Sequence, residues 1–423
     1  MQTITVKINT LAYGGAFVGQ IIDPPSAPPS PLCGKKAFIR QACPGETVEA
    51  EIASDKKSFV EAKILRVLTP ASDRIVPPCP YFEACGGCDL QHLSLPAQRE
   101  AKRRMVEETL RIQGHLKAES GVTLYGADLP GSAYRRRVTL HLNRSGELGF
   151  YRPESDVVVP IDRCWLAVDS INTQIAALQK VRTELAAWVS EVVIEEHDNE
   201  VFTLLKLGQE IAWHDVQSRI KGLLLTLVPN LTLFEGDKEH VLSRRFSEVT
   251  SDALPVGHFS QVNEQGNARL VELVCRAIDA ERLTELYAGA GNLTLALAQK
   301  GVHVTAVELD PALVQYGKTL AQRAGVGAQI EFIHSSAESY VRSHRLKGTV
   351  LLDPPRSGAK EVVQALTAGQ INQIVYVSCS LPNLVRDLKV LASKGFVLKH
   401  VEVLDMFPQT HHVEMVAELV AAR

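Results

Sequence analysis

Residues 283–292 read Leu-Thr-Glu-Leu-Tyr-Ala-Gly-Ala-Gly-Asn, and this stretch decides the fold of the C-terminal part of the chain. An apolar, strand-like segment runs into Gly289 and Gly291, where the backbone can turn tightly. A helical segment then begins at Asn292. Because strand-like and helical segments go on alternating downstream, we predict a doubly wound, mostly parallel β-sheet with right-handed crossovers.

The remaining strands of this sheet follow from the same alternation. The strands expected after the first one are 303–310, 328–334, 348–355 and 373–380. Two more strand-like segments, 396–408 and 413–421, come next with no helix between them. Their hairpin should add one antiparallel strand, which is typical of a Rossmann-like α/β fold.

The N-terminal part, residues 1–68, contains about five short strand-like segments interrupted by turn residues. Gly14-Gly15 and Pro44-Gly45 mark two of the turns. The proline-rich stretch 24–31 cannot lie inside a sheet and must form a loop. Several short strands in so few residues predict a small, OB-like β-barrel.

Residues 69–250 mix helical and strand-like segments and predict a central α+β domain. Helical periodicity covers 96–113 and 169–192. Strand-like segments are 135–153, 201–208, 223–237 and 240–246. The chain is therefore expected to have three domains, with boundaries 1–68, 69–250 and 251–423.

The composition describes a water-soluble chain of more than one domain. Its 423 residues are too many for one ordinary domain, and 45% are hydrophobic while 22% are charged. No apolar run reaches 18 residues, and the N-terminus has no signal-peptide core, so we expect a cytoplasmic protein. The eight cysteines should then be reduced. With a net charge of −3, a nucleic-acid binder would have to gather its basic residues, for example Arg103-Arg104 and Arg135–Arg137.

Ligands of doubly wound sheets bind outside the carboxyl ends of the strands. Here the first strand ends in the Gly-x-Gly turn, and the second ends at Glu308, whose carboxylate can hold a ribose diol. Thr294 stands where a dinucleotide fingerprint has its third glycine, which disfavours hydride transfer. The turn alone is a weak signal, but together with Glu308 it favours S-adenosylmethionine, which has a ribose and an adenine but no pyrophosphate.

The next two strand tips carry the candidates for the reacting groups. The fourth strand ends at Asp353, followed by Pro354-Pro355-Arg356, and the fifth ends at Cys379. Asp353 could merely cap a helix and Cys379 could fill the core, because free cysteine is among the most buried residue types. A strand tip beside the cofactor is, however, where a nucleophile would have to lie.

A cysteine in this position is suited to methylating C5 of uracil. That carbon is a poor nucleophile until a thiolate adds to C6, and a base must afterwards remove the C5 proton so that the thiolate can leave. Glu414, in His411-His412-Val413-Glu414 before the last strand, supplies an acid for the role of the base. The sequence therefore offers Cys379 as nucleophile and Glu414 as base.

Two other methyl-transfer chemistries are disfavoured by Arg356. RNA cytosine-5 methyltransferases use the same covalent logic, but they usually have a cysteine directly after the proline of this motif. Amino-group methyltransferases favour an aromatic residue after Asp-Pro-Pro. This chain has Arg356 there, so both departures favour uridine.

A second group of cysteines lies far from the sheet tips in sequence. Cys79, Cys85 and Cys88 are closely spaced, and Cys164 is the best candidate for a fourth ligand. Four thiolates fit either zinc or a [4Fe–4S] cluster, and spacing alone does not decide between them. The remaining cysteines are expected to be structural: Cys33, Cys43 and Cys275.

With these motifs together, the chain resembles the RNA uridine-5-methyltransferase family, which includes bacterial tRNA and 23S rRNA enzymes, over almost its whole length. The resemblance implies a TRAM domain, an RNA-binding barrel, around Pro44-Gly45-Glu46. It also implies a Rossmann-like methyltransferase domain. The segment 72–92 resembles the iron–sulfur segment of the family, which moves our choice of metal from zinc to [4Fe–4S].

The resemblance also assigns roles to single residues. The residues that match the family's contacts to S-adenosylmethionine are Gln261, Tyr287, Asn292, Glu308 and Asp353. Cys379 falls on the nucleophile and Glu414 on the catalytic base. The chain departs from the family at Ser380-Leu381, where Asn-Pro is usual, and at Ala288, where a cysteine is usual.

The expected partner is RNA, with 23S rRNA favoured over tRNA because relatives having both the barrel and the cluster are mostly rRNA enzymes. Nothing in the sequence implies a membrane or a protein partner, and we expect a monomer. Two other hypotheses are an RNA cytosine-5 methyltransferase and an RNA-binding module with a degenerate catalytic domain, which the change at Ser380-Leu381 would fit.

Overall fold

The computed structural model describes residues 2–22, 32–197, 199–208, 211–224, 227–228, 230–236, 238–243 and 261–422. The chain divides into two compact units. The first unit consists of 1–75, 92–129 and 266–423, and the second consists of 76–91 and 130–265.

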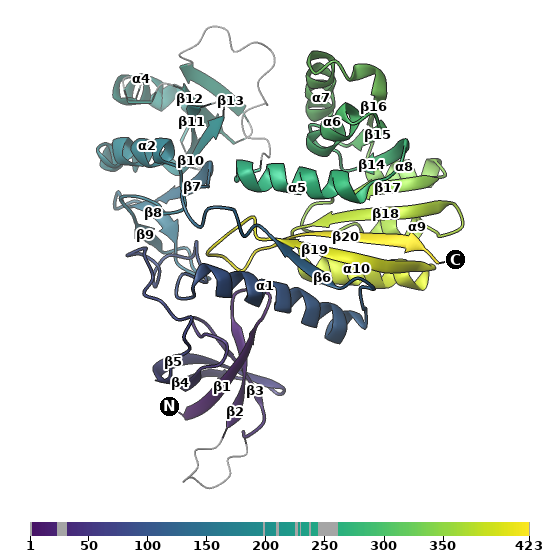
Figure 1. Cartoon of the computed structure of the whole chain (residues 1–423). Helices are drawn as coiled ribbons and strands as arrows, with labels where there is room; N and C mark the ends of the chain where they lie inside the picture. Colours follow the sequence, from purple (N-terminus) through teal and green to yellow (C-terminus); the bar gives the residue numbers. More distant parts are fainter. Residues whose placement is uncertain are drawn as a thin grey trace. The chain divides into compact units, whose positions relative to one another are not determined.

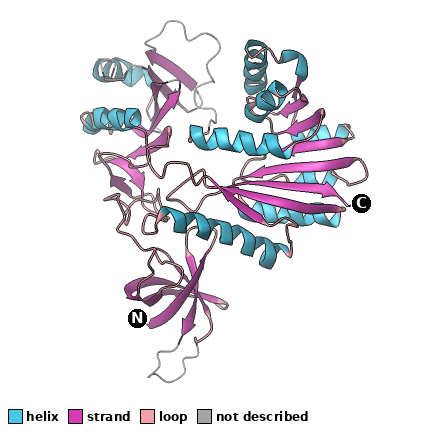
Figure 2. Cartoon of the chain, in the orientation of Figure 1, coloured by secondary structure: helices cyan, strands magenta, loops and turns pink. Residues whose placement is uncertain are grey.

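The first unit begins with a closed five-stranded barrel (Figures 1 and 2). Its strands are β1 (Thr3–Leu11), β2 (Phe17–Ile22), β3 (Lys36–Ile39), β4 (Thr47–Asp55) and β5 (Phe59–Thr69), in the order β1-β2-β3-β5-β4. Alternate residues of β1 point inward, so that Val6 and Ile8 are buried while Lys7 is exposed. The prediction of a small N-terminal barrel is confirmed, and the proline-rich stretch 24–31 lies outside the described residues.

The larger part of the first unit is an eight-stranded sheet in the order β16-β15-β14-β17-β18-β20-β19-β6. Its strands are β6 (Val122–Tyr125), β14 (Arg282–Leu286), β15 (His303–Glu308), β16 (Ile330–His334), β17 (Gly348–Leu352), β18 (Ile371–Ser378), β19 (Phe396–Leu404) and β20 (Glu414–Ala421). The five strands from β14 to β18 run parallel, and β20 runs antiparallel to both of its neighbours. The Rossmann-like fold is thus confirmed, including its antiparallel strand. The sequence did not reveal that β6 joins the sheet.

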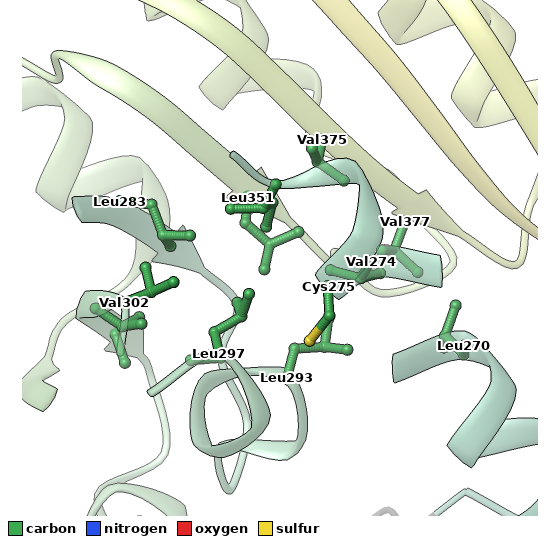
Figure 3. Close-up of a cluster of buried hydrophobic side chains, with 14 of the residues drawn as sticks. Leu270, Val274, Cys275, Leu283, Leu293, Leu297, Val302, Leu351, Val375 and Val377 are labelled. Atoms are coloured by element: carbon green, nitrogen blue, oxygen red, sulfur yellow. The ribbon is translucent and has the colours of Figure 1, made fainter. Parts of the chain in front are cut away.

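Helices cover this sheet, and their apolar residues explain how they pack. The helices of the first unit are α1 (Leu95–Thr109), α5 (Glu264–Ala277, whose first two residues belong to the second unit), α6 (Asn292–Gln299), α7 (Pro311–Arg323), α8 (Ala337–Ser343), α9 (Lys360–Ala365) and α10 (Leu381–Ser393), with a π-helical turn at Leu110–Gly114. Figure 3 shows side chains of α5 and α6 directed at strand residues such as Leu283 and Val375. On α10 the buried leucines 381, 384, 388 and 391 recur at helical spacing and pack toward β19.

The second unit contains a seven-stranded sheet in the order β13-β12-β11-β10-β7-β8-β9. Its strands are β7 (Arg137–Leu142), β8 (Leu148–Tyr151), β9 (Val158–Pro160), β10 (Val189–His197), β11 (Glu200–Leu207), β12 (Asn230–Glu235) and β13 (Lys238–Ser243). Its helices are α2 (Asp169–Gln179), α3 (Arg182–Leu185) and α4 (Trp213–Leu224). Buried aliphatic side chains of the helices and strands form one core.

Two sequence predictions for this unit are corrected. The helix expected over 169–192 ends at Gln179, and β10 begins at Val189, because Val192 and its neighbours pair with Leu140 of β7 and Leu205 of β11. Cross-strand packing of β-branched residues outweighs the local helical pattern there. The strand expected over 223–237 is also too long, since its first two residues end α4 and the strand begins at Asn230.

A buried ion triad joins α1 to the segment after β19. Asp405 accepts hydrogen bonds from Lys102 Nζ at 2.6 Å and from Arg99 Nε at 3.1 Å. Lys102 and Asp405 are completely buried, and Arg99 nearly so. Lys102 also donates to the Phe407 carbonyl at 3.0 Å. This triad ties α1 to the end of β19 in a place from which water is excluded.

Lys102→Ala should lower the free energy of unfolding by about 3 kcal/mol, because it leaves the Asp405 carboxylate buried with only one of its two cationic partners. Arg66→Ala is the control: it removes an exposed pair with Glu49 and should cost less than about 1 kcal/mol. Urea unfolding followed by circular dichroism compares the two. Equal losses in both proteins would contradict the stabilising role of the triad.

Candidate active site

The carboxyl ends of the parallel strands bring most of the predicted site residues to one edge of the sheet. Leu286 at the end of β14 pairs with Leu352 at the end of β17, which in turn pairs with Tyr376 of β18. Asp353 follows Leu352 directly, and Cys379 follows the end of β18. These loops therefore open on the edge at which such sheets bind their ligands.

The turn after β14 adopts the tight geometry that its glycines allow. Gly289 and Gly291 have positive φ angles of 56° and 91°, and Tyr287 also has a positive φ of 66°. The Gly289 N–H donates to Glu308 Oε2 at 2.8 Å. The other oxygen of Glu308 accepts from the Asp310 N–H at 2.9 Å. Glu308 is thus held across the turn at the end of β15, where the sequence placed it.

Tyr287 forms a hydrogen bond with a second carboxylate at this edge, that of Glu338. Its hydroxyl donates to Glu338 Oε1 at 2.8 Å, and burial together with this carboxylate raises the pKa of Tyr287. Glu338 was not singled out from the sequence. The available signal was its place in the first turn of α8, which follows a strand of the same sheet.

Two polar pairs fix the start of α6. Asn292, its first residue, exchanges side-chain hydrogen bonds with Asn267 of α5 at 2.8 and 2.9 Å. Thr294 donates to Glu285 Oε2 at 2.6 Å. Burial raises the pKa of Glu285 to about 8. Thr294, which stands where a dinucleotide fingerprint has its third glycine, therefore supplies a hydrogen-bond donor to the buried carboxyl group of Glu285.

Cys379 and Glu414 are brought together by the register of two antiparallel strands. Ser378, the last residue of β18, pairs with Met415 of β20, and Cys379 and Glu414 are the residues next to that pair. The Glu414 carboxylate lies close enough to the Cys379 thiol to act on it electrostatically. The sequence placed Glu414 only near the last strand, and the sheet order brings it next to the cysteine.

The ionisation of these groups reflects their burial and their mutual proximity. Burial, Glu414 and Asp353 together raise the pKa of the Cys379 thiol to about 11, whereas Arg356 opposes the rise. Burial and then Asp353 raise the pKa of Glu414, and burial raises that of Asp353 to about 7. Glu414 is buried, Cys379 and Asp353 are half-buried and Arg356 is exposed, so two acids, a thiol and one guanidinium lie near one another at the edge of the sheet.

The loop from Arg356 to Ala359 is clamped by α10. Asn383 Nδ2 donates to the Arg356 carbonyl at 2.6 Å, and Arg386 Nη2 donates to the Ser357 carbonyl at 3.0 Å. Asp387 Oδ2 accepts from the Ala359 N–H at 2.8 Å. The guanidinium-bearing loop is therefore fixed to the helix that follows Cys379.

Ser380 and Leu381, where the family usually has Asn-Pro, are accommodated by this helix. The Ser380 N–H donates to Ser378 Oγ at 3.1 Å, and the Ser380 hydroxyl accepts from Asn383 Nδ2 at 3.0 Å. Leu381 is completely buried at the start of α10. The chain next to Cys379 is thus hydrogen-bonded and packed in spite of the departure.

Gln261 is the one predicted cofactor residue that belongs to the second unit. It is half-buried and precedes α5. Phe259 and Ser260, which precede it in the sequence, lie outside the described residues. The other predicted cofactor residues belong to the first unit.

The four predicted cluster cysteines lie together in the second unit. Burial raises the pKa of Cys85 to about 11 and raises those of Cys88 and Cys164, and the thiols also act on one another, with Cys79 a neighbour of all three. Their segments are joined where the Asp162 N–H donates to the Tyr81 hydroxyl at 3.1 Å. Within the described ranges, no three His, Cys, Asp or Glu side chains have an arrangement that could hold a metal ion.

The basic runs are largely engaged by carboxylates. Arg103 pairs with Glu100 and Glu107 on α1, and Arg104 also pairs with Glu100. In the second unit, Arg136 pairs with Glu264 and Glu196, and Arg137 with Glu195.

As for a membrane, no described helix combines the length and the apolarity needed to cross one.

Comparisons with known proteins identify the class. The family model described as tRNA (Uracil-5-)-methyltransferase matches residues 250–421. Curated relatives named as RNA uracil-C5-methyltransferases are 33% identical to the chain over 91% of its length. This chain belongs to the RNA uracil-5-methyltransferase family, as its motifs predicted.

Particular relatives refine the comparison. A 23S rRNA (uracil(1939)-C(5))-methyltransferase RlmD of Shewanella sp. (strain MR-7) is 33% identical, with 91% of this chain and 90% of the relative covered. The RlmD of Shewanella sediminis is 32% identical, with 98% and 95% covered. A solved structure of Pyrococcus abyssi tRNA (uracil-54, C5)-methyltransferase with S-adenosyl-L-homocysteine has a TM-score of 0.69, at 19% identity and with 98% and 100% covered, and it shows the shared fold.

Proposed function

We propose that this chain transfers a methyl group from S-adenosylmethionine to C5 of a uridine in 23S rRNA, through a covalent bond between Cys379 and C6 of the base. The observation that carries this proposal is the proximity of Cys379 and Glu414 at the adjoining ends of β18 and β20, with Asp353 and Arg356 close to the thiol. A nucleophile and a base on the two sides of one small space are what the reaction requires.

The donor would bind at the turn after β14. Glu308, oriented by the Gly289 N–H, can accept hydrogen bonds from a ribose diol, and Tyr287, Asn292, Asp353 and Gln261 are the other proposed contacts. Bound S-adenosylmethionine supplies the methyl group as an electrophilic sulfonium. A neighbour of known structure holds the corresponding product, S-adenosyl-L-homocysteine, on the same fold.

The residues of the chain would act in the following order. Cys379 gives its proton to water and its thiolate adds to C6, so that C5 becomes nucleophilic. C5 then takes the methyl group as the S–CH3 bond of the sulfonium breaks, and the sulfur keeps the electron pair in S-adenosyl-L-homocysteine, which leaves. Glu414, as carboxylate, then accepts the proton from C5; the C5–C6 double bond re-forms as the C6–S bond breaks and the thiolate leaves. Because burial holds Cys379 as a thiol, Arg356 is the group that favours its thiolate.

The target uridine must leave its stack to reach the two side chains. The preference for 23S rRNA is supported by the names of the curated relatives. The alternative is tRNA, which is the substrate in the names of the family model and of the Pyrococcus abyssi enzyme.

Trapping with fluorinated RNA tests the proposal. Fluorine at C5 cannot leave as a proton, so protein incubated with S-adenosylmethionine and 5-fluorouridine-substituted 23S rRNA fragments should give a shifted band on a denaturing gel. The same reaction with tRNA decides between the two RNA classes. Trapping by 5-fluorocytidine instead would favour a cytosine enzyme, and no band with any RNA would overturn the proposed activity.

The second part of the proposal is a [4Fe–4S] cluster held by Cys79, Cys85, Cys88 and Cys164. Four mutually interacting thiols in one unit match the donor set of such a cluster. Because these residues belong to the second unit, we assign the cluster no step in methyl transfer.

Cys85→Ser should lose the brown colour and most of the visible absorbance of anaerobically prepared protein, because one of the four iron ligands is removed. Cys33→Ser, which changes an exposed cysteine in the other unit, should keep both. Iron and sulfide analysis gives the stoichiometry. Wild-type protein prepared without oxygen that contains zinc and no iron would refute the cluster.

A further inference from the structure

A run of aromatic rings crosses from the barrel to the segment between β19 and β20. Tyr13 meets His411 edge-on, with ring centroids 5.6 Å apart and planes at 84°. The ring centroids of His411 and His412 are 4.1 Å apart, and those of His412 and Phe407 are 6.3 Å apart. We call these four residues, all in the first unit, the aromatic run.

The barrel end of the run is held by a tight turn between β1 and β2. The Ala12 N–H donates to the Ala16 carbonyl at 2.8 Å, and Gly14 and Gly15 take positive φ angles of 101° and 85°. Tyr13 lies at the tip of this turn and keeps 36% of its surface exposed. Part of the phenol ring therefore remains available to a ligand although the turn is fixed.

The other end of the run is held by α1. Gln98 Nε2 donates to Gln409 Oε1 at 2.8 Å, and the Gln409 N–H donates back to Gln98 Oε1 at 2.9 Å. This pair supports Gln409 in a left-handed conformation, with φ of 70°, which is costly for a residue other than glycine. Lys102 holds the Phe407 carbonyl from the same helix. The histidines are thus carried by a segment with a preset shape.

The run lies beside the proposed reaction. His411 and His412 precede Glu414 by three and two residues, and Glu414 lies near the Cys379 thiol. A uridine that leaves its stack exposes the faces of its neighbouring bases. RNA-binding proteins stack such unpaired bases on aromatic side chains.

We infer that the aromatic run is an RNA subsite on which an unpaired base next to the target uridine stacks, with the exposed part of the Tyr13 ring as the platform and His411 of the catalytic segment supporting that ring edge-on. The subsite rests on the proposed function, because its ligand is the RNA substrate. Rings recognise the flat face that all bases share, so the subsite adds affinity and position with little sequence preference. It also makes the barrel part of the active site.

The test uses 23S rRNA fragments with 2-aminopurine at single positions beside the target uridine, since stacking on an aromatic ring quenches this fluorescent base. Wild-type protein should quench the probe at one flanking position. Tyr13→Ala should relieve that quenching and weaken RNA binding roughly tenfold, the range measured for loss of one base–aromatic stack. Tyr13→Phe should restore both, which a role for the hydroxyl would not allow.

Tyr340→Ala is the matched control. Tyr340 lies on α8 and stacks on His344, with ring centroids 4.2 Å apart. This substitution should leave quenching and affinity unchanged. Wild-type protein that binds and traps the RNA, combined with a Tyr13→Ala protein of equal affinity and equal quenching, would overturn the subsite and leave the proposed function standing. Wild-type protein that neither binds nor traps RNA would overturn both.

Discussion

Cys379→Ala should reduce methyl transfer by more than about 10⁴-fold, because no other group in the site can form the bond to C6. RNA affinity should stay within about threefold, since one small side chain at a strand tip is removed. Transfer of labelled methyl groups to RNA and filter binding measure the two quantities. The band trapped by 5-fluorouridine should be absent.

Cys275→Ala is the control for this experiment, because Cys275 is also buried in the first unit but lies within the apolar core on α5. It should retain trapping and most of the activity. A Cys379→Ala protein that still methylates uridine would place the nucleophile elsewhere or make the reaction non-covalent.

Glu414→Gln should separate the two halves of the reaction. The amide fills the same space but cannot accept the C5 proton, so the methylated RNA should stay attached to Cys379 and turnover should fall by about 10²- to 10⁴-fold. A denaturing gel with ordinary, unfluorinated RNA should then show a persistent adduct. Accumulation of the adduct distinguishes loss of the base from loss of the whole site.

Glu418→Gln is the matched control on the same strand, where Glu418 accepts a hydrogen bond from Gln373. It should turn over without accumulating adduct. Because burial and Asp353 raise the pKa of Glu414, its carboxylate form is lost well above the pH at which an exposed glutamate protonates. On acidification, wild-type turnover should therefore begin to fall at a pH well above the one at which an exposed glutamate is protonated. Normal turnover by Glu414→Gln would refute the assignment of Glu414 as the base.

Some strands and helices of the fold could be predicted from the sequence, and others could not. Alternating patterns predicted the barrel and the strands β14 to β18, because hydrophobic period and glycine turns are local signals. Strand β6 was missed because Val122–Tyr125 is four residues long and gains its partner, β19, only in the folded sheet. The helix expected over 169–192 was right as far as Gln179 and wrong at its end, for the related reason that β10 is stabilised by distant strands.

The candidate site shows the same division. Single residues such as Cys379 and Glu308 could be singled out because strand ends have a known place in this fold. Their partners could not be found in this way: the proximity of Cys379 and Glu414 depends on β20 entering the sheet between β18 and β19. The contact between Tyr287 and Glu338 joins two separate loops, and no periodicity predicts it.

The position of β6 has a consequence for biosynthesis. This strand and α1 are made before most of the second unit, yet β19, the partner of β6, begins only at Phe396. At 5–20 residues per second, the ribosome needs about 15 to 55 s to deliver that partner. The barrel strands are all available after residue 69 and can pair during translation, whereas the nascent edge strand stays unpaired until synthesis is nearly finished. Chaperone protection of the growing chain is therefore needed most in that interval.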